Sequence, residues 1–374
     1  MKSKKILYVV NVDWFFISHR LIIAEEAKKK GFDVIVAAED TGRSNEIKEK
    51  GIEFINLAFS RSGTNIFKEF IILIKFFKLY SKIKPDIIHH ITLKPVIYGS
   101  IIAKFLNIKY IVNAVSGLGY NFTQQRRNKI HTIMLCLMKF GFNNKIFFIF
   151  QNKDDYKELL DLKVLQSNNN VLFIKGSGVN LNTFYPTEFP SFNLIKIVLP
   201  TRMLWDKGVN EFLVATNQLK KKYASKIQFL LVGMFDEHNK ASVPLDILKQ
   251  YENGSYVKWI GHQKNIFEIY RDCHIVVLPS YREGLPKSLI EACAMGRAII
   301  TTDAIGCKEC VDEGINGLKV PVKDAKSLAN AIEILVNNPN KIINMGLASR
   351  IKAEKEFDLN NVIKSHLEIY NQCL

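Results

Sequence analysis

Short apolar segments alternate with longer amphipathic ones along almost the whole chain. In the first half, runs rich in β-branched and aromatic residues stand at Ile6–Val10, Val34–Ala38, Phe54–Leu57, Ile87–His89, Tyr110–Val112, Ile146–Phe150 and Val171–Ile174. In the second half, similar runs stand at Ile195–Leu199, Phe229–Val232, Val257–Ile260, Ile275–Leu278, Ala298–Thr301 and Leu318–Val320. Such runs are typical of strands buried on both faces of a parallel sheet. Helical stretches such as Arg20–Lys30 and Lys153–Leu162 fall between them, which predicts βαβ units and a doubly wound α/β fold.

The chain is long enough for two such domains. It has 374 residues, and one domain usually takes about 100–200. The stretch Tyr185–Ser191 carries two prolines and no periodicity, so we interpret it as the linker between domains. We therefore expect an N-terminal domain over residues 1–187 and a C-terminal domain from residue 188. Ligands commonly bind between such domains, beyond the carboxyl ends of parallel strands.

Positive charge is concentrated in the first half of the chain. The protein has 52 Lys and Arg against 36 Asp and Glu, a net charge of +16, and residues 62–150 alone hold 13 basic and 2 acidic residues. Within Phe67–Lys84, lysines recur at helical spacing among aliphatic and aromatic residues. They are Lys68, Lys75, Lys78 and Lys82, and further basic residues near the apolar run Ile133–Met138 are Arg126, Arg127, Lys129, Lys139 and Lys145.

This pattern favours an anionic membrane surface as a partner. Basic amphipathic helices lie in the headgroup plane of anionic membranes. The alternative is that the apolar residues pack in the core while the lysines face water, but the local concentration of charge favours the membrane. The longest uninterrupted hydrophobic run, Ile133–Met138, has six residues, far short of the roughly 20 that span a bilayer. Nucleic acid is not an expected partner, because no module interleaves basic residues with exposed aromatic ones.

Candidate chemistry follows the strand Ile275–Leu278. The residues after it include Glu283, then Gly284, Leu285, Pro286 and Lys287, and finally Glu291. A proline suits the start of a helix near Lys287, whose amino terminus favours an anion. Carboxylates are bidentate acceptors that suit vicinal sugar hydroxyls. Taken alone, two glutamates eight residues apart carry little information, and Glu291 could equally face solvent.

Two cations follow the strand Ile195–Leu199. Arg202 can present a planar fork and Lys207 a point charge to the oxygens of a diphosphate. By itself, such a pair is more often a solvated surface cluster. Its place relative to the two glutamates favours a binding role.

The stretch from Pro279 to Gly296 resembles the Glu-x7-Glu signature of family 4 of the retaining glycosyltransferases, which have the GT-B fold of two Rossmann-like domains facing across a cleft. Further matches are Thr201–Gly208, Trp259–Gly261, Thr302–Glu309 and Gly314–Gly317. Phe357–Tyr370 resembles the final helix of this fold, which crosses back to the first domain. The resemblance covers nearly the whole chain and implies a nucleotide-sugar-binding domain over 188–355, followed by that helix over 356–374.

The resemblance implies roles for the residues of the second half. Glu283 would be a catalytic residue that holds the donor sugar, and Glu291 would hold the ribose. Arg202 and Lys207 would bind the diphosphate of the donor. The helix start formed by Gly284, Leu285, Pro286 and Lys287 would bind it as well.

The first half carries the expected acceptor site. Most family members have a Gly-Gly loop after the first strand with a His four residues on. Here Trp14 and Phe15 replace the glycines, and His19 matches the His. Trp14 either shapes an acceptor pocket or plugs it. After Ile87–His89, we expect His90 as a second catalytic residue and Lys94, with Trp14 and His19, as acceptor-binding, although a buried and satisfied His is the alternative for His90.

The segment Ser116–Tyr120, the Trp-Phe loop and the His-x-x-x-Lys-Pro pattern resemble a subgroup that builds O-antigens, capsules and related lipid-linked oligosaccharides. Those relatives use UDP-sugars, often N-acetylhexosamines, and undecaprenyl-diphosphate-linked acceptors. The resemblance implies a hexosyltransferase that moves an N-acetylhexosamine from a UDP-sugar to a lipid-linked saccharide. The alternatives are another hexose (Gal, Glc or Man) in the same pathway, or a GT-B nucleotide-sugar epimerase.

Neither a metal nor a cofactor is expected, and the UDP-sugar is a substrate. No Asp-x-Asp occurs in the chain, so no carboxylate pair for a divalent cation is evident. Cys307 and Cys310 form a Cys-x-x-Cys without a second pair, which does not suffice for a structural zinc site. The expected location is cytoplasmic, peripheral on the inner face of the bacterial cytoplasmic membrane.

Overall fold

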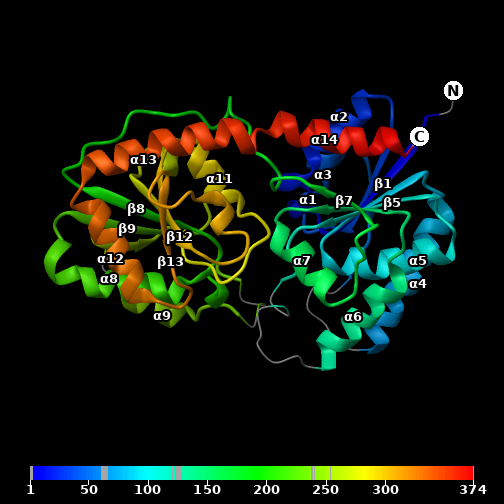
Figure 1. Cartoon of the computed structure of the whole chain (residues 1–374), viewed down its shortest axis with the longest axis horizontal. Coiled ribbons are helices and arrows are strands. Elements are labelled where there is room, and N and C mark those ends of the chain that lie inside the picture. The colour runs from blue at the N-terminus through cyan, green and yellow to red at the C-terminus, as the bar shows by residue number, and fades with distance from the viewer. Residues whose placement is uncertain are drawn as a thin grey trace. The chain divides into compact units, whose positions relative to one another are not determined.

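The computed structural model of the chain describes residues 3–59, 66–119, 122, 129–236, 239, 241–252 and 254–373. The chain divides into two compact units, one of Met1–Ser177 with Asn360–Leu374 and the other of Gly178–Leu359 (Figure 1). Each unit holds a parallel sheet flanked by helices, which confirms the predicted α/β fold of two doubly wound Rossmann-like domains. Each predicted strand overlaps an observed one. The segment Tyr185–Ser191 lies within the second unit.

The first unit is built on a seven-stranded sheet in the order β3-β2-β1-β4-β5-β6-β7. Its strands are β1 (Lys5–Val12), β2 (Asp33–Glu39), β3 (Glu53–Asn56), β4 (Ile87–Ile91), β5 (Tyr110–Val115), β6 (Ile146–Phe150) and β7 (Asn170–Phe173). Neighbouring strands are parallel. The strand order reverses between β1 and β4, the place where open parallel sheets bind ligands.

Alternate side chains of this sheet pack against two helix layers. Leu7 and Val9 of β1 belong to the core on one face, and Ile6, Tyr8 and Val10 belong to the core on the other. The first layer comprises α4 (Ile66–Ile83), η1 (Pro95–Gly99), α5 (Ser100–Phe105), α6 (Lys129–Gly141) and α7 (Lys153–Asp161). The second comprises α1 (Asp13–His19), α2 (Leu21–Lys29), α3 (Ser44–Lys48) and α14 (Leu359–Gln372). Burial on both faces explains why the strands are continuous apolar runs.

The last helix, α14, belongs to the core of the first unit. Val362, Ile369 and Tyr370 are buried. The hydroxyl of Tyr370 lies 2.9 Å from that of Tyr8 and 2.7 Å from Nδ1 of His89. Two separate stretches of chain are therefore required to complete this unit.

The second unit has a six-stranded parallel sheet in the order β10-β9-β8-β11-β12-β13. Its strands are β8 (Ile195–Pro200), β9 (Ile227–Val232), β10 (Val257–Trp259), β11 (Ile275–Leu278), β12 (Ala298–Thr302) and β13 (Gly317–Val320). Its helices are η3 (Trp205–Lys207), α8 (Val209–Tyr223), α9 (Leu245–Tyr251), α10 (Ile266–Arg271), α11 (Lys287–Ala294), η4 (Lys308–Cys310), α12 (Ala325–Val336), α13 (Pro339–Lys352) and η5 (Ala353–Phe357). Here the strand order reverses between β8 and β11.

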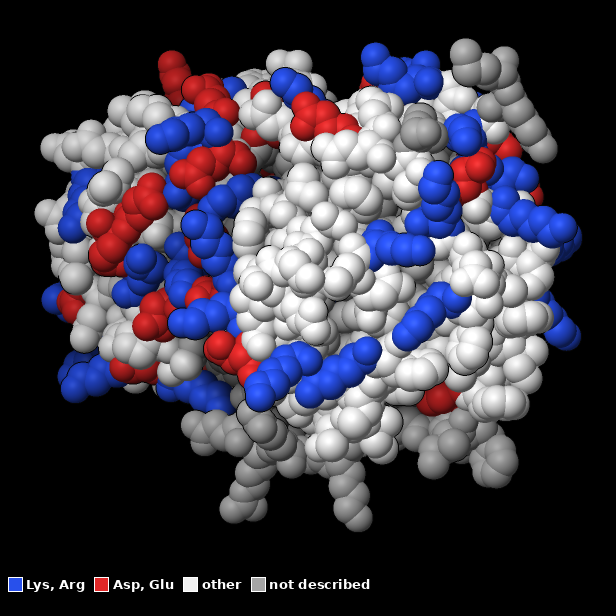
Figure 2. All heavy atoms as spheres, turned by 45° about the vertical axis from the view of Figure 1, so that its right-hand side comes forward, with Lys and Arg blue, Asp and Glu red and all other residues white. Residues whose placement is uncertain are grey.

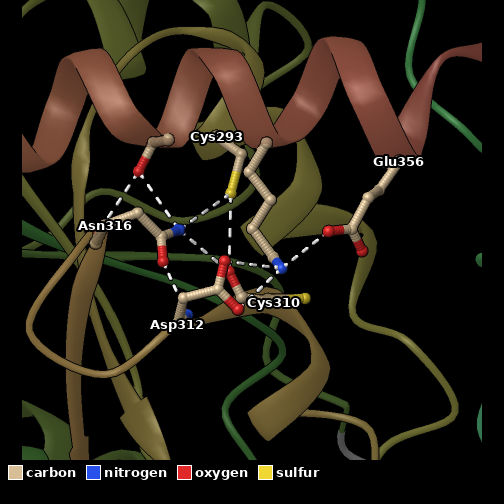
Figure 3. Close-up of polar contacts among 7 residues, drawn as sticks. Cys293, Cys310, Asp312, Asn316 and Glu356 are labelled. Carbon is tan, nitrogen blue, oxygen red and sulfur yellow. Dashed lines mark hydrogen bonds and ion pairs between the residues drawn. The ribbon is translucent and has the colours of Figure 1, made fainter.

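A polar network around Lys352, which includes the labelled Asp312 and Glu356 of Figure 3, fixes the end of α13. The side-chain amine lies 3.0 Å from Asp312 and 3.1 Å from Glu356. Burial alone would lower the pKa of Lys352, but its hydrogen bonds to Asp312 and Glu356 outweigh burial and raise it. Asn316 joins the network by accepting a 2.7 Å hydrogen bond from the backbone amide of Asp312, and its side-chain amide donates a hydrogen bond to Ser349. Because Glu356 lies in η5, the network holds the turn that leads into α14.

Within the described ranges, no helix combines the length and the apolar character that crossing a membrane requires. Several predicted positions lie outside those ranges. Arg126, Arg127 and Tyr120 are among them, and the side chains of Lys68 and Lys129 are not described either.

Candidate functional site

Three loops meet at the carboxyl edge of the second sheet. They follow β8, β11 and β12, which are neighbours in the sheet, and the strand order reverses between the first two. This reversal leaves room for a ligand, because the connections on its two sides lead away in opposite directions. The backbone carbonyl of Asp206, after β8, accepts hydrogen bonds from the amide of Tyr281 and the hydroxyl of Ser280, after β11. The first two loops are therefore tied together.

Two glycines allow these loops to approach closely. Gly208 has φ +73°, and a Cβ atom there would lie 2.1 Å from the carbonyl oxygen of Pro279. Gly306, after β12, has φ +80°, and a Cβ atom there would lie 2.2 Å from the carbonyl oxygen of Glu283. Only glycine fits a left-handed backbone in such close contact. Close packing of the loops therefore requires glycine at positions 208 and 306.

An ion pair between Lys207 and Glu283 lies where these loops meet. Nζ of Lys207 is 2.6 Å from Oε1 of Glu283, and the two side chains are only 14% and 18% exposed. The hydroxyl of Ser280, which is fully buried, lies 3.0 Å from the same carboxylate oxygen and 3.1 Å from the Asp206 carbonyl, so these two acceptors share its single hydrogen. The structure therefore brings together two of the predicted site residues from loops 76 residues apart in sequence. Sequence reasoning missed the role of Ser280, although it follows β11 directly after Pro279.

Glu291 lies on α11, which begins at Lys287 with Pro286 as its N-cap. Its side chain is nearly buried, and Oε1 lies 3.6 Å from Nζ of Lys287. Burial raises the pKa of Glu291, and the nearby Lys287 ammonium opposes this effect. The amino terminus of a helix carries partial positive charge. Gly284 and Leu285, which precede it, and Lys287 therefore stand at an end of α11 that favours an anion.

Arg202 is the other predicted cation. It follows β8, and its guanidinium lies 3.4 Å from the carboxylate of Asp236, with the Arg202 side chain 36% exposed. Arg202 and Lys207 thus come from the same loop, but only Lys207 is paired with Glu283. Sequence reasoning did not identify Asp236 as the partner of Arg202.

In the first unit, Trp14 and His19 lie on helix α1, which takes the place of the expected loop. The His19 ring stacks on Phe15, with ring centres 4.1 Å apart, and its Nδ1 lies 2.6 Å from the hydroxyl of Ser18. Buried Asp13 starts this helix and accepts hydrogen bonds from the backbone amides of Thr41 and Arg43. The aromatic residues that replace the glycines are therefore part of a regular helix.

Lys94 and His90 have different surroundings. Lys94 lies 2.7 Å from Glu69 of α4, and both side chains are less than one-fifth exposed. His90 is fully buried, with Nε2 2.8 Å from the Tyr80 hydroxyl and Nδ1 2.8 Å from Asn113. Burial lowers the pKa of His90 to about 4. His90 thus has the surroundings of a core histidine, fully buried with both ring nitrogens engaged, and its catalytic role stays a prediction.

Polar atoms without partners lie at the carboxyl ends of three neighbouring strands of the first sheet. They are Oδ1 of Asn11 in β1, Oγ1 of Thr92 after β4 and the hydroxyl of Ser116 after β5, each shielded from solvent. Thr92 also has φ +70°, a rare conformation for a β-branched residue. Buried polar groups normally have partners. The sequence did not single out these three residues as candidate site residues. The only signal was that each follows a predicted strand.

Within the described residues, no group of three or more His, Cys, Asp or Glu side chains could hold a metal ion. Cys307 and Cys310 are both buried, and burial raises the pKa of the Cys307 thiol to about 12. The Cys-x-x-Cys therefore belongs to the core.

Family models match both parts of the chain. Residues 5–152 match the model described as glycosyl transferase 4-like, and residues 192–352 match the model described as glycosyl transferases group 1. The chain is 29% identical to N,N'-diacetylbacillosaminyl-diphospho-undecaprenol alpha-1,3-N-acetylgalactosaminyltransferase of Campylobacter jejuni, over 95% of each chain. It is 21% identical to UDP-Gal:alpha-D-GlcNAc-diphosphoundecaprenol alpha-1,3-galactosyltransferase of Escherichia coli, over 89% of this chain and 90% of the relative.

The fold resembles that of several solved structures. A glycosyltransferase from Rickettsia africae superimposes with a TM-score of 0.75 at 21% identity, over 100% of this chain and 99% of that chain. Anabaena Alr3699/HepE, in complex with UDP-glucose, superimposes with a TM-score of 0.78 at 17% identity, over 98% of this chain and 99% of that chain. This likeness supports the two-domain fold.

Proposed function

The chain belongs to the glycosyltransferases, with a 4-like N-terminal part and a group 1 C-terminal part, and on that premise we propose that it moves a sugar from a UDP-sugar to a polyprenyl-diphosphate-linked saccharide. The observation that carries the proposal is the Lys207–Glu283 pair beside the start of α11. The pair places a cation that can bind a diphosphate beside a carboxylate that can bind sugar hydroxyls. Both lie where the strand order reverses between β8 and β11. The reaction would serve surface polysaccharide assembly.

Different residues of the second unit would bind different parts of the donor. Lys207, Arg202 and the helix start at Gly284–Lys287 would hold the diphosphate, and Glu291 would hold the ribose hydroxyls. Glu283 would hold the donor sugar. Lys207 and Glu283 orient each other before the donor arrives, so little reorganisation is needed when charge develops on the leaving diphosphate.

We propose transfer with retention of configuration. The acceptor hydroxyl would attack from the face that the nucleoside diphosphate leaves. Its proton would pass to the departing phosphate oxygen, so no protein base is needed. The cations named above supply the positive charge, and on this basis the reaction would need neither a metal nor a cofactor.

The donor and acceptor are proposed from the relatives. The Campylobacter jejuni relative is named as an N-acetylgalactosaminyltransferase and the Escherichia coli relative as a galactosyltransferase, and both names include an undecaprenol-linked diphosphate. We propose an N-acetylhexosamine as the transferred sugar, with galactose or another hexose as the alternative. Trp14, His19 and Lys94 of the first unit would contact the acceptor.

A lipid-linked acceptor implies work at a membrane. We propose that the enzyme acts as a peripheral protein on the inner face of the bacterial cytoplasmic membrane. Residues 62–150 hold 13 basic residues against 2 acidic ones, and this excess supports attraction to anionic lipid.

The test is UDP release across a panel of UDP- and GDP-sugars, with and without a short-chain prenyl-diphosphate-linked N-acetylhexosamine. Release that requires acceptor, occurs with one UDP-sugar and is unaffected by EDTA supports the proposal. Isomerised sugar without acceptor would instead identify an epimerase. No turnover with any donor and acceptor pair would contradict the proposal.

The variant Lys207→Ala tests the site itself. Loss of the cation should lower the rate of acceptor-dependent UDP release by about 10²–10³-fold, the usual effect of removing one preorganised group that stabilises developing charge. The matched control is Lys220→Ala, which removes an exposed lysine of α8 and should leave the rate unchanged. A Lys207→Ala enzyme with the wild-type rate would exclude a role for Lys207 in the reaction.

A further inference from the structure

Three neighbouring helices of the first unit expose large apolar side chains. They are α4, α5 and α6, which lie in the same layer over the sheet (Figure 1). The exposed fractions run from 40% to 64%. The residues are Phe70, Ile71, Ile74 and Phe77 on α4, Phe105 on α5, and Ile130, Ile133 and Phe140 on α6.

These side chains are not needed for the core of the unit. The same helices bury other residues, such as Phe76 and Met138, against the sheet. Phe105 and Phe140 lie with ring centres 6.0 Å apart, which joins the exposed parts of α5 and α6. Soluble proteins rarely expose a large contiguous apolar surface unless it binds something.

Lysines accompany these apolar residues. On α4, Phe70, Ile74 and Phe77 share one stripe of the helix surface, and the exposed Lys78 and Lys82 form the stripe beside it. Lys104 of α5 and Lys139 of α6 are exposed as well, and Nζ of Lys104 lies 4.9 Å from the centre of the Phe140 ring. We call this set of exposed apolar residues and lysines on α4, α5 and α6 the apolar–basic face.

Acidic residues are few around this face. Within residues 62–150 they are Glu69 and Asp86, and Glu69 is paired with Lys94. Figure 2 shows one side of the molecule, on whose right-hand part Lys and Arg side chains are spread over a largely uncharged surface with few acidic ones. The second unit carries acidic and basic side chains in mixture.

We propose that the apolar–basic face inserts its apolar side chains into the headgroup region of an anionic bilayer while its lysines contact the lipid phosphates. Interfacial helices place an apolar stripe just below the headgroups and their cations among them. The inference rests on the proposed function, since a lipid-linked acceptor gives the enzyme a reason to dock. It goes further by assigning the surface and a mode of binding that includes insertion as well as charge.

The charges favour a bilayer over a second copy of the chain. Two copies that met through this face would bring the lysines of each copy toward those of the other. Like charges in a desolvated interface oppose association. An anionic bilayer supplies the opposite charge and an apolar layer together.

The first test measures binding to phosphatidylglycerol-containing vesicles and to pure phosphatidylcholine vesicles. The variant Phe70→Ser/Ile74→Ser/Phe77→Ser should bind anionic vesicles at least about tenfold more weakly than wild type. The matched control Ile334→Ser/Leu347→Ser/Ile351→Ser removes three exposed apolar side chains from the second unit and should bind like wild type. Equal loss in both variants, or in neither, would overturn the proposal.

The charge contribution is tested in the same assay. Lys78→Glu/Lys82→Glu should weaken binding to anionic vesicles at least about tenfold, while Lys220→Glu/Lys221→Glu, with the same change in net charge, should not. Wild-type binding that disappears completely in high salt would mean attraction without insertion and would contradict the proposal. So would a dimer of wild type without lipid that the Phe70→Ser/Ile74→Ser/Phe77→Ser variant abolishes.

Cys136 offers a direct probe of insertion. All six cysteines lie among the described residues, and Cys136, on α6, is exposed whereas the other five are buried. A polarity-sensitive fluorophore on Cys136 should shift to shorter wavelength with anionic vesicles and be quenched by lipids that carry a quencher near the headgroup. An unchanged spectrum on vesicles that do bind the protein would show that another surface docks.

The proposed function and this inference fail in different ways. Transfer to the short-chain acceptor in solution should be the same for wild type and all these variants, while transfer to a full-length acceptor in vesicles should fall with binding. Loss of the solution reaction in wild type would count against the proposed function. A normal solution reaction with no vesicle binding would count against the apolar–basic face alone.

Discussion

The two units differ in how the polar side chains at the carboxyl edges of their sheets are hydrogen-bonded. In the second unit, the loops after β8, β11 and β12 contact one another through Gly208 and Gly306, and Glu283 is satisfied by Lys207 and Ser280. In the first unit, Asn11 and Thr92 keep shielded polar atoms without partners. In the second unit, Oδ1 of Asp206 is also shielded and without a partner. The comparison therefore concerns particular groups: Glu283 of the proposed donor site is paired in advance, whereas Asn11 and Thr92 of the proposed acceptor site are left for a ligand to satisfy.

After the loss expected for Lys207→Ala, the largest expected effect comes from breaking the assembled edge at Gly306. In Gly306→Ala, the new Cβ would lie 2.2 Å from the carbonyl oxygen of Glu283 and 2.6 Å from that of Gly284, both backbone atoms. The loop that carries Glu283 must move to relieve this contact. We expect acceptor-dependent transfer to fall about 100-fold, since displacement of a reacting group by about 1 Å can cost that much. UDP release measures the effect.

Gly314→Ala is the matched control for this variant. Gly314 has φ +74°, close to the φ +80° of Gly306, but a Cβ atom there would meet nothing within 4 Å. It should lose only the stability that a left-handed conformation costs a non-glycine residue, about 1–2 kcal/mol, and keep the wild-type rate. Equal loss of activity in both variants would mean that strain at the glycine, and not contact with the Glu283 loop, is responsible.

A smaller effect is expected at Glu291, where the proposed site costs stability. Burial raises the pKa of Glu291 above its ordinary value of 4.5, so the charged form is less favourable in the folded state than in the unfolded state. Its contribution to folding is therefore most favourable below pH 4.5 and is lost as the pH rises through the folded pKa. Glu291→Gln should raise the melting temperature near neutral pH and lose this advantage under acid conditions.

The same variant should weaken donor binding. If Glu291 holds the ribose hydroxyls, replacing the carboxylate by an amide should raise KM for the UDP-sugar about tenfold, the value of a hydrogen bond to a charged group. Melting curves across pH and donor titrations measure the two effects. A Gln variant that is less stable at neutral pH, with unchanged KM, would mean that Glu291 has a structural role through Lys287.

The sequence predicts the strands of both units, for a physical reason. Strands buried on both faces must be continuous apolar runs, so each predicted segment overlaps a strand. Lys207, Glu283 and Glu291 lie in short loops directly after strands or at a helix start, where local sequence limits the geometry. The burial of His90 depends on Tyr80 and Asn113, which come from other elements and leave no local trace.

The same reason explains what was missed around α1 and α4. Trp14 and Phe15 replace the glycines and lie in a helix instead of a loop. This helix starts at buried Asp13, which is hydrogen-bonded to the distant Thr41, so the local sequence does not reveal it. The exposed stripe of α4 has the composition of a core helix, and the sequence does not tell which apolar residues face the sheet. Phe76 is buried while Phe77 is 48% exposed.

The smallest expected effect tests the open edge of the first unit through Thr92→Val. The hydroxyl of Thr92 has no hydrogen-bond partner, and valine has the same shape and the same β-branching at φ +70°. Stability should therefore be unchanged or slightly higher. If the hydroxyl contacts the acceptor, KM for the short-chain acceptor should rise about three- to tenfold, the value of one neutral hydrogen bond, while KM for the UDP-sugar stays the same.

Thr301→Val in the second unit sharpens this comparison. The Thr301 hydroxyl is buried and donates a 2.7 Å hydrogen bond to the carbonyl of Leu278, so its loss should lower stability by about 1 kcal/mol. Neither substrate should bind differently, because Thr301 lies within β12 and not beyond its end. Opposite outcomes for two identical substitutions would establish that the Thr92 hydroxyl keeps hydrogen-bonding capacity for a ligand and the Thr301 hydroxyl does not. If Thr92→Val instead destabilises the protein as Thr301→Val does, with acceptor KM unchanged, the Thr92 hydroxyl has a partner within the fold and is not left for a ligand.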